Sequence, residues 1–483
     1  MWLISNITKI RRECYAEVAR LIFNDRLIEE IDDLPKKLFP EHLAPQRCCL
    51  FSDRAIVSLQ IRIVLGLNLD EAKNLTLEDC AKKAIFLDST DVFKENLLQV
   101  IDAACQSCPR ERYYVSDVCR NCTGHFCISS CPKEAIVIIN NRATIDTAKC
   151  VECGLCQKGC PYKAIIETRR PCEIACVIKA IVPGEDKKAV INKEDCVYCG
   201  SCSRSCPFGA ISEKTHLVQL IRDIKKGERI AAVVAPSIRG QFGPKVNFEQ
   251  LSTALLKTGF CRVEEVARGA DMVAENEAGE FIKMIESGDK FAITSCCPAF
   301  SGLIHKKYPE QKRTICYSPS PMIKIGSVVK ERYPEEKVCF IGPCVSKKWE
   351  SVNTKAIDYC LTFEELAALF VALNIDVSKM SETMLGEKPT RYGIGFPVSG
   401  GISKAIAAKV KEKSQLEVHP YIINGIEDET FKELAQIFQG ANSYNLIEGI
   451  FCNESCCGGP GVLVPPRNSR REVEKAVRDL KEK

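Results

Sequence analysis

The stretch CVECGLCQKGCP, residues 150–161, decides how the middle of the chain folds. Its four cysteines are separated by two, two and three residues, and a proline follows the last one: Cys150, Cys153, Cys156 and Cys160. The stretch CVYCGSCSRSCP, residues 196–207, repeats this spacing with Cys196, Cys199, Cys202 and Cys206. From residue 105 to residue 206 the chain contains 16 cysteines, the strongest change of composition along the sequence. This pattern predicts small units that fold around what their thiolates bind.

The spacing is that of bacterial ferredoxins, in which the fourth cysteine of each motif binds the neighbouring 4Fe-4S cluster. Zinc ribbons also use pairs of cysteines two residues apart, but they need neither a third cysteine two residues later nor the final Cys-Pro. We therefore expect iron-sulfur clusters in an α+β ferredoxin-like domain over residues 105–215.

A looser copy, CRNCTGHFCISSCP, begins at residue 119. Two extra residues precede its third cysteine, and its predicted ligands are Cys119, Cys122, Cys127 and Cys131. His125 stands at the ordinary spacing after the second cysteine, but thiolate is the usual ligand of this cluster, so Cys127 is preferred and His125 is the minority alternative.

The ferredoxin pairing rule then distributes the cysteines over up to four clusters. The first set is Cys119, Cys122, Cys127 and Cys160, and the second is Cys131, Cys150, Cys153 and Cys156. The third set takes an upstream ligand from RPCEIAC and comprises Cys176, Cys196, Cys199 and Cys202. Elimination leaves a fourth set, Cys105, Cys108, Cys172 and Cys206. Because electrons tunnel only over short gaps, a line of clusters predicts a path that ends at a further site.

Length and charge restrict the class of protein. The 483 residues suffice for two to four domains. Lys plus Arg (67) nearly balance Asp plus Glu (63), and no run of 18 apolar residues occurs, so we expect neither nucleic-acid binding nor a membrane span. The opening MWLISNITKIRREC has no apolar signal core, and 30 cysteines then indicate metal or redox chemistry in a reducing compartment, the cytoplasm.

Two further regions flank the cysteine-rich one. Residues 1–104 have apolar positions at helical spacing and are expected to be helical, with Cys14, Cys48, Cys49 and Cys80 as buried small side chains. From about residue 216 to 483 the sequence pattern is typical of an α/β fold, with predicted buried strands in RIAAVVAPS, KFAITS and KVCFIG. Each strand is followed by a loop with Pro, Ser or Cys, and ligands of α/β folds gather at such strand ends.

Three separated stretches in this last region are TSCCPAF (294–300), GPCVSKKWE (342–350) and EGIFCNESCCGGPG (448–461). They resemble, in order and approximate spacing, the three signature motifs of iron-only (FeFe) hydrogenases. APSIRG (235–240), ADMVAENEAGE (270–280) and PVSGGISKAI (397–406) add to the likeness, which covers roughly residues 105–465. The resemblance implies a two-lobed α/β catalytic domain over residues 216–483.

The resemblance also implies an H-cluster, a 4Fe-4S cubane joined through one thiolate to a two-iron unit with CO, cyanide and a bridging dithiolate amine. Its cubane ligands would be Cys297, Cys344, Cys452 and Cys456, the last also bridging to the two-iron unit. Lys347 would donate to one cyanide, and Pro236 and Ser237 would cradle the other. The role of Cys457, beside a ligand, stays open.

Proton carriers follow from the same resemblance. Cys296 is similar to the family's thiol beside the open iron, Glu277 and Glu280 to its carboxylate relay, and Thr314 stands where a serine hydroxyl is common. Glu350 resembles a secondary carboxylate near the second motif. Without the resemblance, Glu277, Glu280 and Lys347 would be interpreted as solvated surface charges.

The sequence departs from the commonest family pattern at several positions. Gly342 and Ile450 stand where methionines are usual, Ser320 and Pro321 replace glutamines, and CNESC differs between the cysteines of the third motif. These changes resemble a less common subgroup, often called group B. They leave open the turnover rate, the preferred direction and the sensitivity to inhibitors.

The expected function is reversible H2 oxidation and proton reduction, with electrons passing through the 4Fe-4S clusters to a ferredoxin-like carrier. The two-iron unit would come from maturation enzymes. Two alternatives remain: an iron-sulfur assembly or scaffold protein of the same fold without the two-iron unit, and a slow H2 or redox sensor. Infrared bands of metal-bound CO and cyanide would separate the enzyme from the scaffold.

Overall fold

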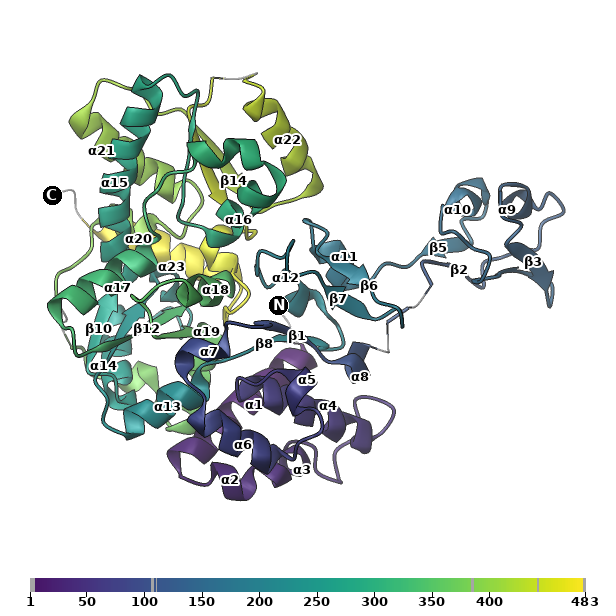
Figure 1. Cartoon of the computed structure of the whole chain (residues 1–483), viewed down its shortest axis with the longest axis horizontal. Helices are drawn as coiled ribbons and strands as arrows, with labels where there is room; N and C mark the ends of the chain where they lie inside the picture. The colour runs from purple at the N-terminus through teal and green to yellow at the C-terminus, as the bar shows by residue number, and fades with distance from the viewer. Residues whose placement is uncertain (1–4, 106–107, 110, 384–385, 441–442, 481–483) are drawn as a thin grey trace.

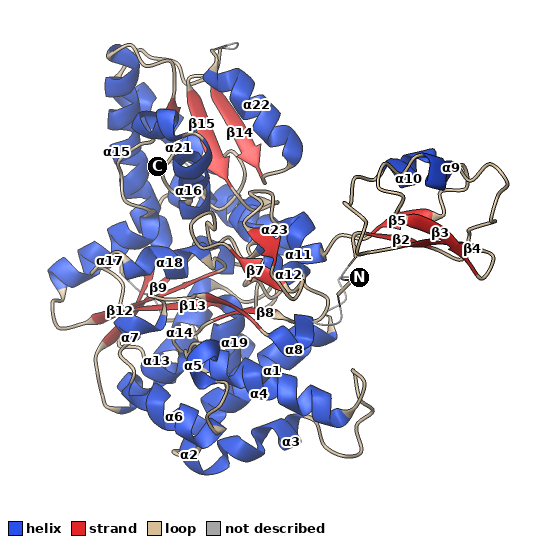
Figure 2. Ribbon diagram, turned by 45° about the vertical axis from the view of Figure 1, so that its right-hand side comes forward, coloured by secondary structure: helices blue, strands red, loops and turns tan. Residues whose placement is uncertain are grey.

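The computed structural model describes residues 5–105, 108–109, 111–383, 386–440 and 443–480. Helices form most of the first hundred residues, as expected (Figure 2). These helices are α1 (Asn6–Phe23), α2 (Leu27–Glu30), α3 (Leu34–Leu38), α4 (Leu50–Val64), α5 (Leu69–Ala72), α6 (Leu77–Phe86) and α7 (Ser89–Val92), with the 3-10 turn η1 (Ile31–Asp33). Ser5 caps α1 by accepting the N–H of Thr8, and the apolar stripe of α1 is buried.

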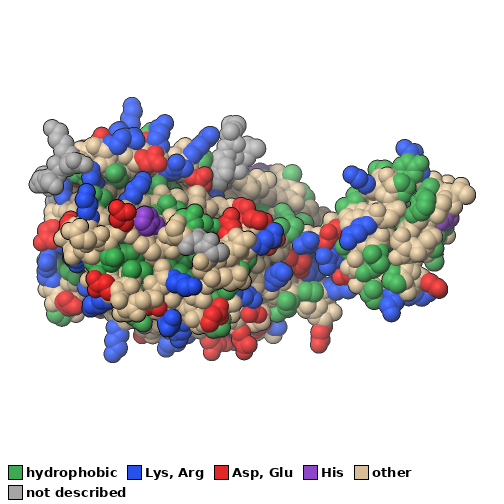
Figure 3. All heavy atoms as spheres, turned by 90° about the horizontal axis from the view of Figure 1, so that it is seen from above, with side chains coloured by type: hydrophobic (Ala, Val, Ile, Leu, Met, Phe, Trp, Pro, Cys, Tyr) green, Lys and Arg blue, Asp and Glu red, His purple; other side chains and the backbone are tan. Residues whose placement is uncertain are grey.

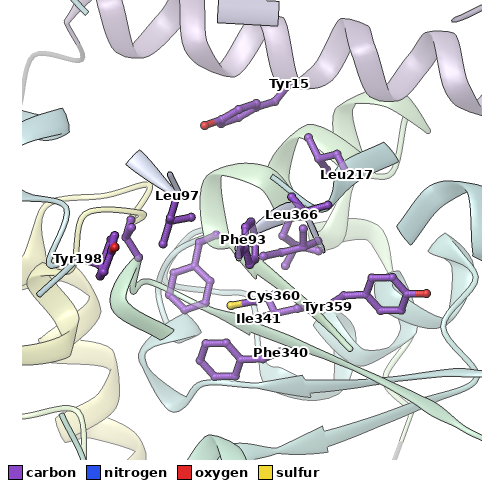
Figure 4. Packing of buried hydrophobic residues seen from close by; sticks show 14 of the residues in the cluster. Tyr15, Phe93, Leu97, Tyr198, Leu217, Phe340, Ile341, Tyr359, Cys360 and Leu366 are labelled. Carbon is purple, nitrogen blue, oxygen red and sulfur yellow. The ribbon is translucent and has the colours of Figure 1, made fainter. Parts of the chain in front are cut away.

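The N-terminal helices are packed onto the C-terminal α/β region, residues 216–483, rather than forming a separate unit. Helix α1 lies along α19 (Phe363–Ala372), where Glu364 accepts hydrogen bonds from Arg11 and Arg12. Figure 4 shows Phe93 and Leu97 among buried side chains of the larger C-terminal sheet, such as Phe340 and Tyr359, with Tyr15 of α1 above them. One continuous hydrophobic core therefore joins the two regions.

Part of the cysteine-rich region forms a separate outer lobe. Residues 113–168 project from the rest of the molecule, as both the ribbon and the space-filling view show (Figures 1 and 3). The lobe has its own small core and contains β2 (Tyr113–Val115), α9 (Phe126–Ser129), β3 (Ile136–Ile139), β4 (Arg142–Ile145), α10 (Leu155–Gly159) and β5 (Ile165–Glu167). Its strands pair antiparallel, β2 with β5 and β3 with β4.

The rest of the cysteine-rich region is part of the main body. Its elements are α8 (Asp102–Cys105), α11 (Pro171–Ala175), β6 (Ile181–Pro183), β7 (Ala189–Ile191), α12 (Ser201–Ser205) and β8 (Ile211–Glu213). Strand β8 pairs antiparallel with β1 (Leu98–Val100), so the helical region and the end of the ferredoxin-like region share a sheet. The expected boundaries near residues 104 and 215 therefore separate segments that share one core.

Two parallel sheets form the two lobes of the C-terminal α/β region. The larger has the strand order β10-β9-β12-β13, and the smaller β11-β15-β14. Their bounds are β9 (Ile230–Val234), β10 (Arg262–Glu265), β11 (Ala292–Ile293), β12 (Lys337–Gly342), β13 (Tyr359–Thr362), β14 (Pro420–Asn424) and β15 (Leu446–Ile450). The three strands expected from RIAAVVAPS, KFAITS and KVCFIG are β9, β11 and β12. Parallel sheets covered by helices need such continuous apolar strands.

Helices surround both sheets (Figures 1 and 2). They are α13 (Leu217–Lys225), α14 (Phe248–Thr258), α15 (Val266–Glu286), α16 (Pro298–Lys307), α17 (Pro321–Arg332), α18 (Ser346–Val352), α20 (Arg391–Gly395), α21 (Gly401–Lys413), α22 (Asp428–Phe438) and α23 (Pro466–Asp479). Short 3-10 turns complete the set, namely η2 (Pro236–Ile238), η3 (Pro309–Thr314), η4 (Val377–Lys379) and η5 (Ser455–Gly458). Across the described ranges, none of the helices is both long and apolar enough to span a membrane.

Candidate functional site

The four cysteines of the signature motifs follow the carboxyl ends of parallel strands. Cys297 follows β11 and caps α16, Cys344 follows β12, Cys452 follows β15, and Cys456 lies in η5. The carboxyl ends of parallel strands meet at one edge of a sheet, so the two sheets deliver these loops to a common place. We call Cys297, Cys344, Cys452 and Cys456 the four-cysteine site.

The pKa values of these thiols show that they lie together. Burial raises the pKa of Cys344 to about 12, with a further contribution from Cys297. Burial also raises the pKa of Cys452 and Cys456 well above the usual range, and the neighbouring thiols Cys297 and Cys344 raise both values further. Four crowded, partly buried thiols resist ionisation unless a positive group is bound between them. This donor set fits an iron-sulfur cubane held by thiolates.

A single metal ion is a poorer fit. Among the described residues, no three His, Cys, Asp or Glu side chains lie close enough to hold one ion. A cubane needs a wider arrangement, because each thiolate binds a different iron atom.

The turn of the third motif lies very close to the second motif. A Cβ atom on Gly459 would be 2.7 Å from the carbonyl oxygen of Pro343, and one on Gly461 would be 2.6 Å from the Cβ of Thr362. The N–H of Gly461 donates to that same carbonyl of Pro343, at 2.9 Å. Glycine is required here because larger residues would push the loop of Cys344 away from that of Cys456.

Pro236 and Ser237 lie in η2, directly after β9. The side chain of Ser237 is wholly buried, and its hydroxyl has no hydrogen-bond partner among the described residues. Its carbonyl accepts bonds from Gln241 and Ser469, which fix the turn. A buried hydroxyl without a partner fits a polar ligand atom at this place.

Lys348 is fully buried and Lys347 mostly so, but their ammonium groups have different partners. The ammonium of Lys347 donates to the carbonyl of Cys296 at 3.3 Å and pairs with Glu350 at 2.7 Å. Burial acts to lower the pKa of Lys347, but Glu350 and the nearby thiols outweigh it and the pKa is raised. Lys348 instead pairs with Glu365 at 2.8 Å, both side chains fully buried. The interpretation of Lys347 as a solvated charge is wrong.

Glu277, on α15, is hydrogen-bonded to Cys296 and to the residue before it, Ser295. One carboxylate oxygen accepts the N–H of Ser295 at 2.9 Å, its hydroxyl at 2.7 Å and the thiol of Cys296 at 3.7 Å. Its other oxygen has no partner among the described residues. Burial raises the pKa of Glu277 to about 7, and burial together with Glu277 raises the pKa of Cys296 well above its usual value. Glu277 is therefore not on a solvated helix face, whereas Glu280 is partly exposed.

Glu280 lies one turn further along α15 and connects to the surface. Its carboxylate accepts the hydroxyl of Ser318 at 2.8 Å and the N–H of Tyr317 at 2.6 Å. The hydroxyl of Ser295 also lies 2.6 Å from the carbonyl oxygen of Ser318. Hydrogen bonds thus run from Cys296 through Glu277 and Ser295 to the backbone carbonyl of Ser318, and the hydroxyl of Ser318 separately bonds Glu280. Tyr317, beside Glu280, is 77% exposed.

The predicted hydroxyl, Thr314, makes a different contact. It is buried at the end of η3 and donates to the carbonyl of Gln311 at 2.8 Å rather than to either carboxylate. The sequence analysis missed Ser295, Ser318 and Cys316, and the thiol of Cys316 interacts with both Glu277 and Glu280. Of these three residues, only Ser295 could have been found from the sequence, because it directly precedes Cys296 and Cys297.

The 16 cysteines of the ferredoxin-like region gather in the predicted groups. The first set lines a cavity of about 30 Å³ that His125 also lines, and the second lines one of about 20 Å³. Burial raises the pKa of Cys202 well above the usual range, with contributions from Cys199, Cys196 and Cys176. Burial raises the pKa of Cys172 to about 12, with contributions from Cys206, Cys108 and Cys105. Cluster binding by each set, and the choice between Cys127 and His125, stay predictions.

A repeat that the sequence analysis overlooked accompanies these sets. Four times a cysteine accepts the N–H of an alanine four residues later, at 3.2–3.3 Å: Cys131 with Ala135, Cys160 with Ala164, Cys176 with Ala180 and Cys206 with Ala210. An isoleucine follows each alanine and begins a strand. Cys176 therefore occupies the same local structure as the fourth cysteine of an ordinary motif, and N–H groups directed at sulfur tune cluster potentials.

The third set lies beside the four-cysteine site. Burial raises the pKa of Cys199, and the thiols of Cys176 and Cys297 contribute. Three contacts join the loops: the hydroxyl of Ser346 donates to the carbonyl of Val197 at 3.1 Å, Tyr198 stacks on Trp349 at 4.5 Å, and Arg204 donates to the carbonyls of the glycine turn. Cys172 of the fourth set in turn contributes to the raised pKa of Cys202, a member of the third set. The sets thus follow one another outward from the four-cysteine site.

Comparison with known proteins agrees with this arrangement. The family described as iron only hydrogenase large subunit, C-terminal domain, matches residues 228–460, and the 4Fe-4S binding domain matches residues 143–166 and 189–212. Iron hydrogenase 1 of Clostridium pasteurianum is 28% identical over 400 residues, which are 71% of this chain and 69% of that protein.

A second curated relative is the periplasmic Fe hydrogenase large subunit of Nitratidesulfovibrio vulgaris. It is 28% identical over 381 residues, covering 66% of this chain and 87% of the relative. Among solved structures, a variant of an FeFe-hydrogenase from Chlamydomonas reinhardtii is 16% identical with a TM-score of 0.47, covering 55% of this chain and 90% of the other.

Proposed function

We propose that this chain is an iron-only hydrogenase and that it interconverts protons, electrons and H2 at the four-cysteine site. The convergence of Cys297, Cys344, Cys452 and Cys456 with Lys347 and Cys296 carries this proposal. The donor set fits the cubane of an H-cluster, and the unpartnered hydroxyl of Ser237 fits a polar ligand of its two-iron unit. When bound, the H-cluster supplies redox-active iron with an open position at which H2 is formed or split.

The protein groups around this site bind and orient. Cys456 lies in a turn that the glycines hold against the loop of Cys344, so both thiolates keep fixed positions. Lys347, anchored by Glu350, supplies a compact ammonium for a negatively charged ligand atom such as cyanide nitrogen. Pro236 and Ser237, in the turn after β9, would supply backbone and hydroxyl contacts to the other cyanide. Glu350 therefore acts by positioning Lys347.

Cys296 and Glu277 move the proton nearest the site. Both groups have raised pKa values, so near neutral pH the thiol is protonated and the carboxyl takes up and releases a proton readily. The thiol hydrogen is directed at the carboxylate oxygen 3.7 Å away, and replacement of a proton lost from Cys296 comes from Glu277.

Two serine hydroxyls join Glu277 to Glu280 in our proposal. The single O–H of Ser295 can donate either to Glu277 or to the carbonyl of Ser318, at 2.7 and 2.6 Å. When Glu277 carries a proton, it can donate to the oxygen of Ser295 while that hydroxyl turns to the carbonyl. A carbonyl oxygen cannot pass a proton on, so in this proposal a water molecule carries the proton from the hydroxyl of Ser318 to that of Ser295, and Ser318 takes its replacement from Glu280. Glu280 then exchanges protons with solvent beside exposed Tyr317.

Electrons pass through the accessory sets in the order third, fourth and then the outer lobe. The support is that Cys297 contributes to the raised pKa of Cys199 and Cys172 to the raised pKa of Cys202. We propose a ferredoxin-like protein as the external carrier, and maturation enzymes as the source of the two-iron unit. We also propose a cytoplasmic location, because the many free cysteines suit a reducing compartment. Cell fractionation tests this, since one relative is periplasmic.

The deciding experiment is infrared spectroscopy of the purified protein after maturation with the two-iron unit. The hydrogenase proposal predicts bands of metal-bound CO and cyanide together with H2 evolution from a reduced viologen dye. A protein with its cubanes but without these bands and without turnover would instead be the scaffold. Slow but measurable turnover would support the sensor and the less common subgroup, for which Gly342 and Ile450 are the motivating residues.

A further inference from the structure

Cys48 and Cys49 are adjacent cysteines outside every set described above. The expectation that all four N-terminal cysteines are buried is correct for Cys14 and Cys80 but wrong for this pair, because Cys48 is exposed and Cys49 is partly exposed. Their sulfur atoms lie 3.9 Å apart in the loop before α4. We propose that Cys48 and Cys49 form a surface dithiol that small disulfides oxidise reversibly to a disulfide.

The surroundings of Cys48 favour reaction. A hydrogen bond from Ser52 and another from Cys49 lower the pKa of Cys48, so more of it is thiolate near neutral pH. Cys49 is the N-cap of α4, a helix of 15 residues whose positive end faces the pair. Asp53, an acid in the first turn of α4, accepts bonds from Gln46 and Arg47. The pair is thus an accessible nucleophile with a second thiol beside it.

The reaction is thiol-disulfide exchange in two steps. The thiolate of Cys48 attacks one sulfur of a small disulfide and releases one small thiol, leaving a mixed disulfide. Cys49 loses its proton, attacks the sulfur of Cys48 and releases the second small thiol. Two protein thiols are oxidised, and the small disulfide is reduced to two thiols. A bond between neighbouring residues closes a small ring over adjacent Cα atoms about 3.8 Å apart, below the usual disulfide range, so it should be easily reduced.

The loop that carries the pair is tied to a predicted cluster ligand. Arg47, next to Cys48, donates to the carbonyl of Phe208 at 2.8 Å and pairs with buried Asp53 at 3.1 Å. Phe208 lies two residues after Cys206, whose sulfur accepts the N–H of Ala210. Ring closure changes the backbone directly after Arg47 and should weaken its bond to the turn of Cys206. This second step rests on the proposed fourth cluster.

The chemistry is tested on the full-length protein with its clusters, kept without oxygen in glutathione buffers of increasing oxidised fraction. Free thiols are then alkylated and the peptides are analysed by mass spectrometry. We expect the peptide with both cysteines to lose two hydrogens, and dithiothreitol to restore them. Cys48→Ser and Cys49→Ser should each abolish this loss. An unmodified pair, or a glutathione adduct that remains on Cys48 of the wild type, would overturn the proposal.

The coupling to the cluster is tested by electron paramagnetic resonance of the same samples after reduction. Oxidation should shift one cluster signal in the wild type and none in Cys49→Ser. If the disulfide forms while all signals stay unchanged, the coupling is wrong. If iron analysis shows that the fourth cluster does not exist, the electron path in the proposed function is wrong, whereas the mass measurement still decides the dithiol chemistry.

Discussion

The outer lobe and the inner end of the cysteine-rich region contain the same repeat but are built into the molecule differently. In the lobe, the repeats at Cys131 and Cys160 pack on a small separate core, and apolar side chains such as Phe126 and Val151 remain exposed. At the inner end, the repeats at Cys176 and Cys206 belong to the main core and contact the catalytic loops.

The difference shows that the local repeat shapes each predicted cluster pocket. The packing around the repeat then decides how many other parts of the protein are affected when one cysteine is replaced. The inner cysteines share their core with the catalytic sheets and the N-terminal helices, so losing a group there should affect the whole reaction. The lobe contacts itself much more than the body, so losing one of its cysteines should affect only exchange with the carrier.

The largest effect is expected for Cys297→Ala. It removes one of four converging thiolates, so the cubane should not assemble and H2 turnover should disappear. Iron analysis and electron paramagnetic resonance check this. Cys457→Ser is the matched control, because Cys457 points into a separate small core with Val473. Full cubane content in Cys297→Ala would refute the ligand assignment.

Cys296→Ala should leave every cluster in place but slow turnover by about a hundredfold or more, the range of a lost general acid. The reason is that the thiol bonded to Glu277 is removed. Dye-linked H2 evolution and the infrared spectrum are measured on the same sample. Near wild-type turnover would remove Cys296 from the proton path.

Glu277→Gln should lower turnover by about a hundredfold and remove a pH dependence near 7. In the wild type, the carboxyl is protonated below its pKa of about 7 and ionised above it. H2 evolution needs the protonated form and should fall as the pH rises through about 7, whereas H2 oxidation should rise. Glu275→Gln, at an exposed acid on the same helix that pairs with Lys413, is the control. An unchanged pH profile in Glu277→Gln would contradict the relay.

Ser318→Ala should reduce turnover by about tenfold, a smaller effect because water can replace one hydroxyl near the surface. Thr314→Val should change it by less than about twofold, since its hydroxyl is bonded to a backbone carbonyl. Steady-state rates of the two variants are compared at one pH. A larger loss of turnover in Thr314→Val than in Ser318→Ala would favour the proton path through Thr314 that the family resemblance implied.

The smallest effect on dye-linked turnover is expected for Cys156→Ala in the outer lobe. A dye can deliver electrons to the inner clusters directly, so that rate should stay near wild type while the ferredoxin-linked rate falls several-fold. The ratio of the two rates is the measurement, with Val151→Ala as a control at an exposed lobe position. An equal fall of both rates would show that the lobe is not a separate electron entrance.

The sequence predicted the elements that have a short, periodic signature. The strands before Pro236, Cys296 and Cys344 are continuous apolar runs, and the cysteine spacings defined four sets that the fold brings together. These patterns are local, so tertiary packing had little to override.

The remaining features depend on contacts between distant segments. Nothing in the composition of the N-terminal helices indicated that Arg11 and Arg12 meet Glu364, or that β1 pairs with β8. Ser295 and Ser318 are ordinary residues until α15 places two carboxylates beside them. The exposure of Cys48 was missed because a free cysteine without ligand spacing is usually buried.

The pairing of β1 with β8 has a consequence for how the protein is assembled. Leu98–Val100 and Ile211–Glu213 close a loop that contains all 16 ferredoxin-like cysteines. The entropic cost of closing a loop grows with its length, and every cluster that cross-links cysteines within it shortens the chain still to be ordered. During synthesis, β1 must also wait until its partner has been made. Loading of the inner clusters and docking of the N-terminal helices should therefore be a single cooperative folding step.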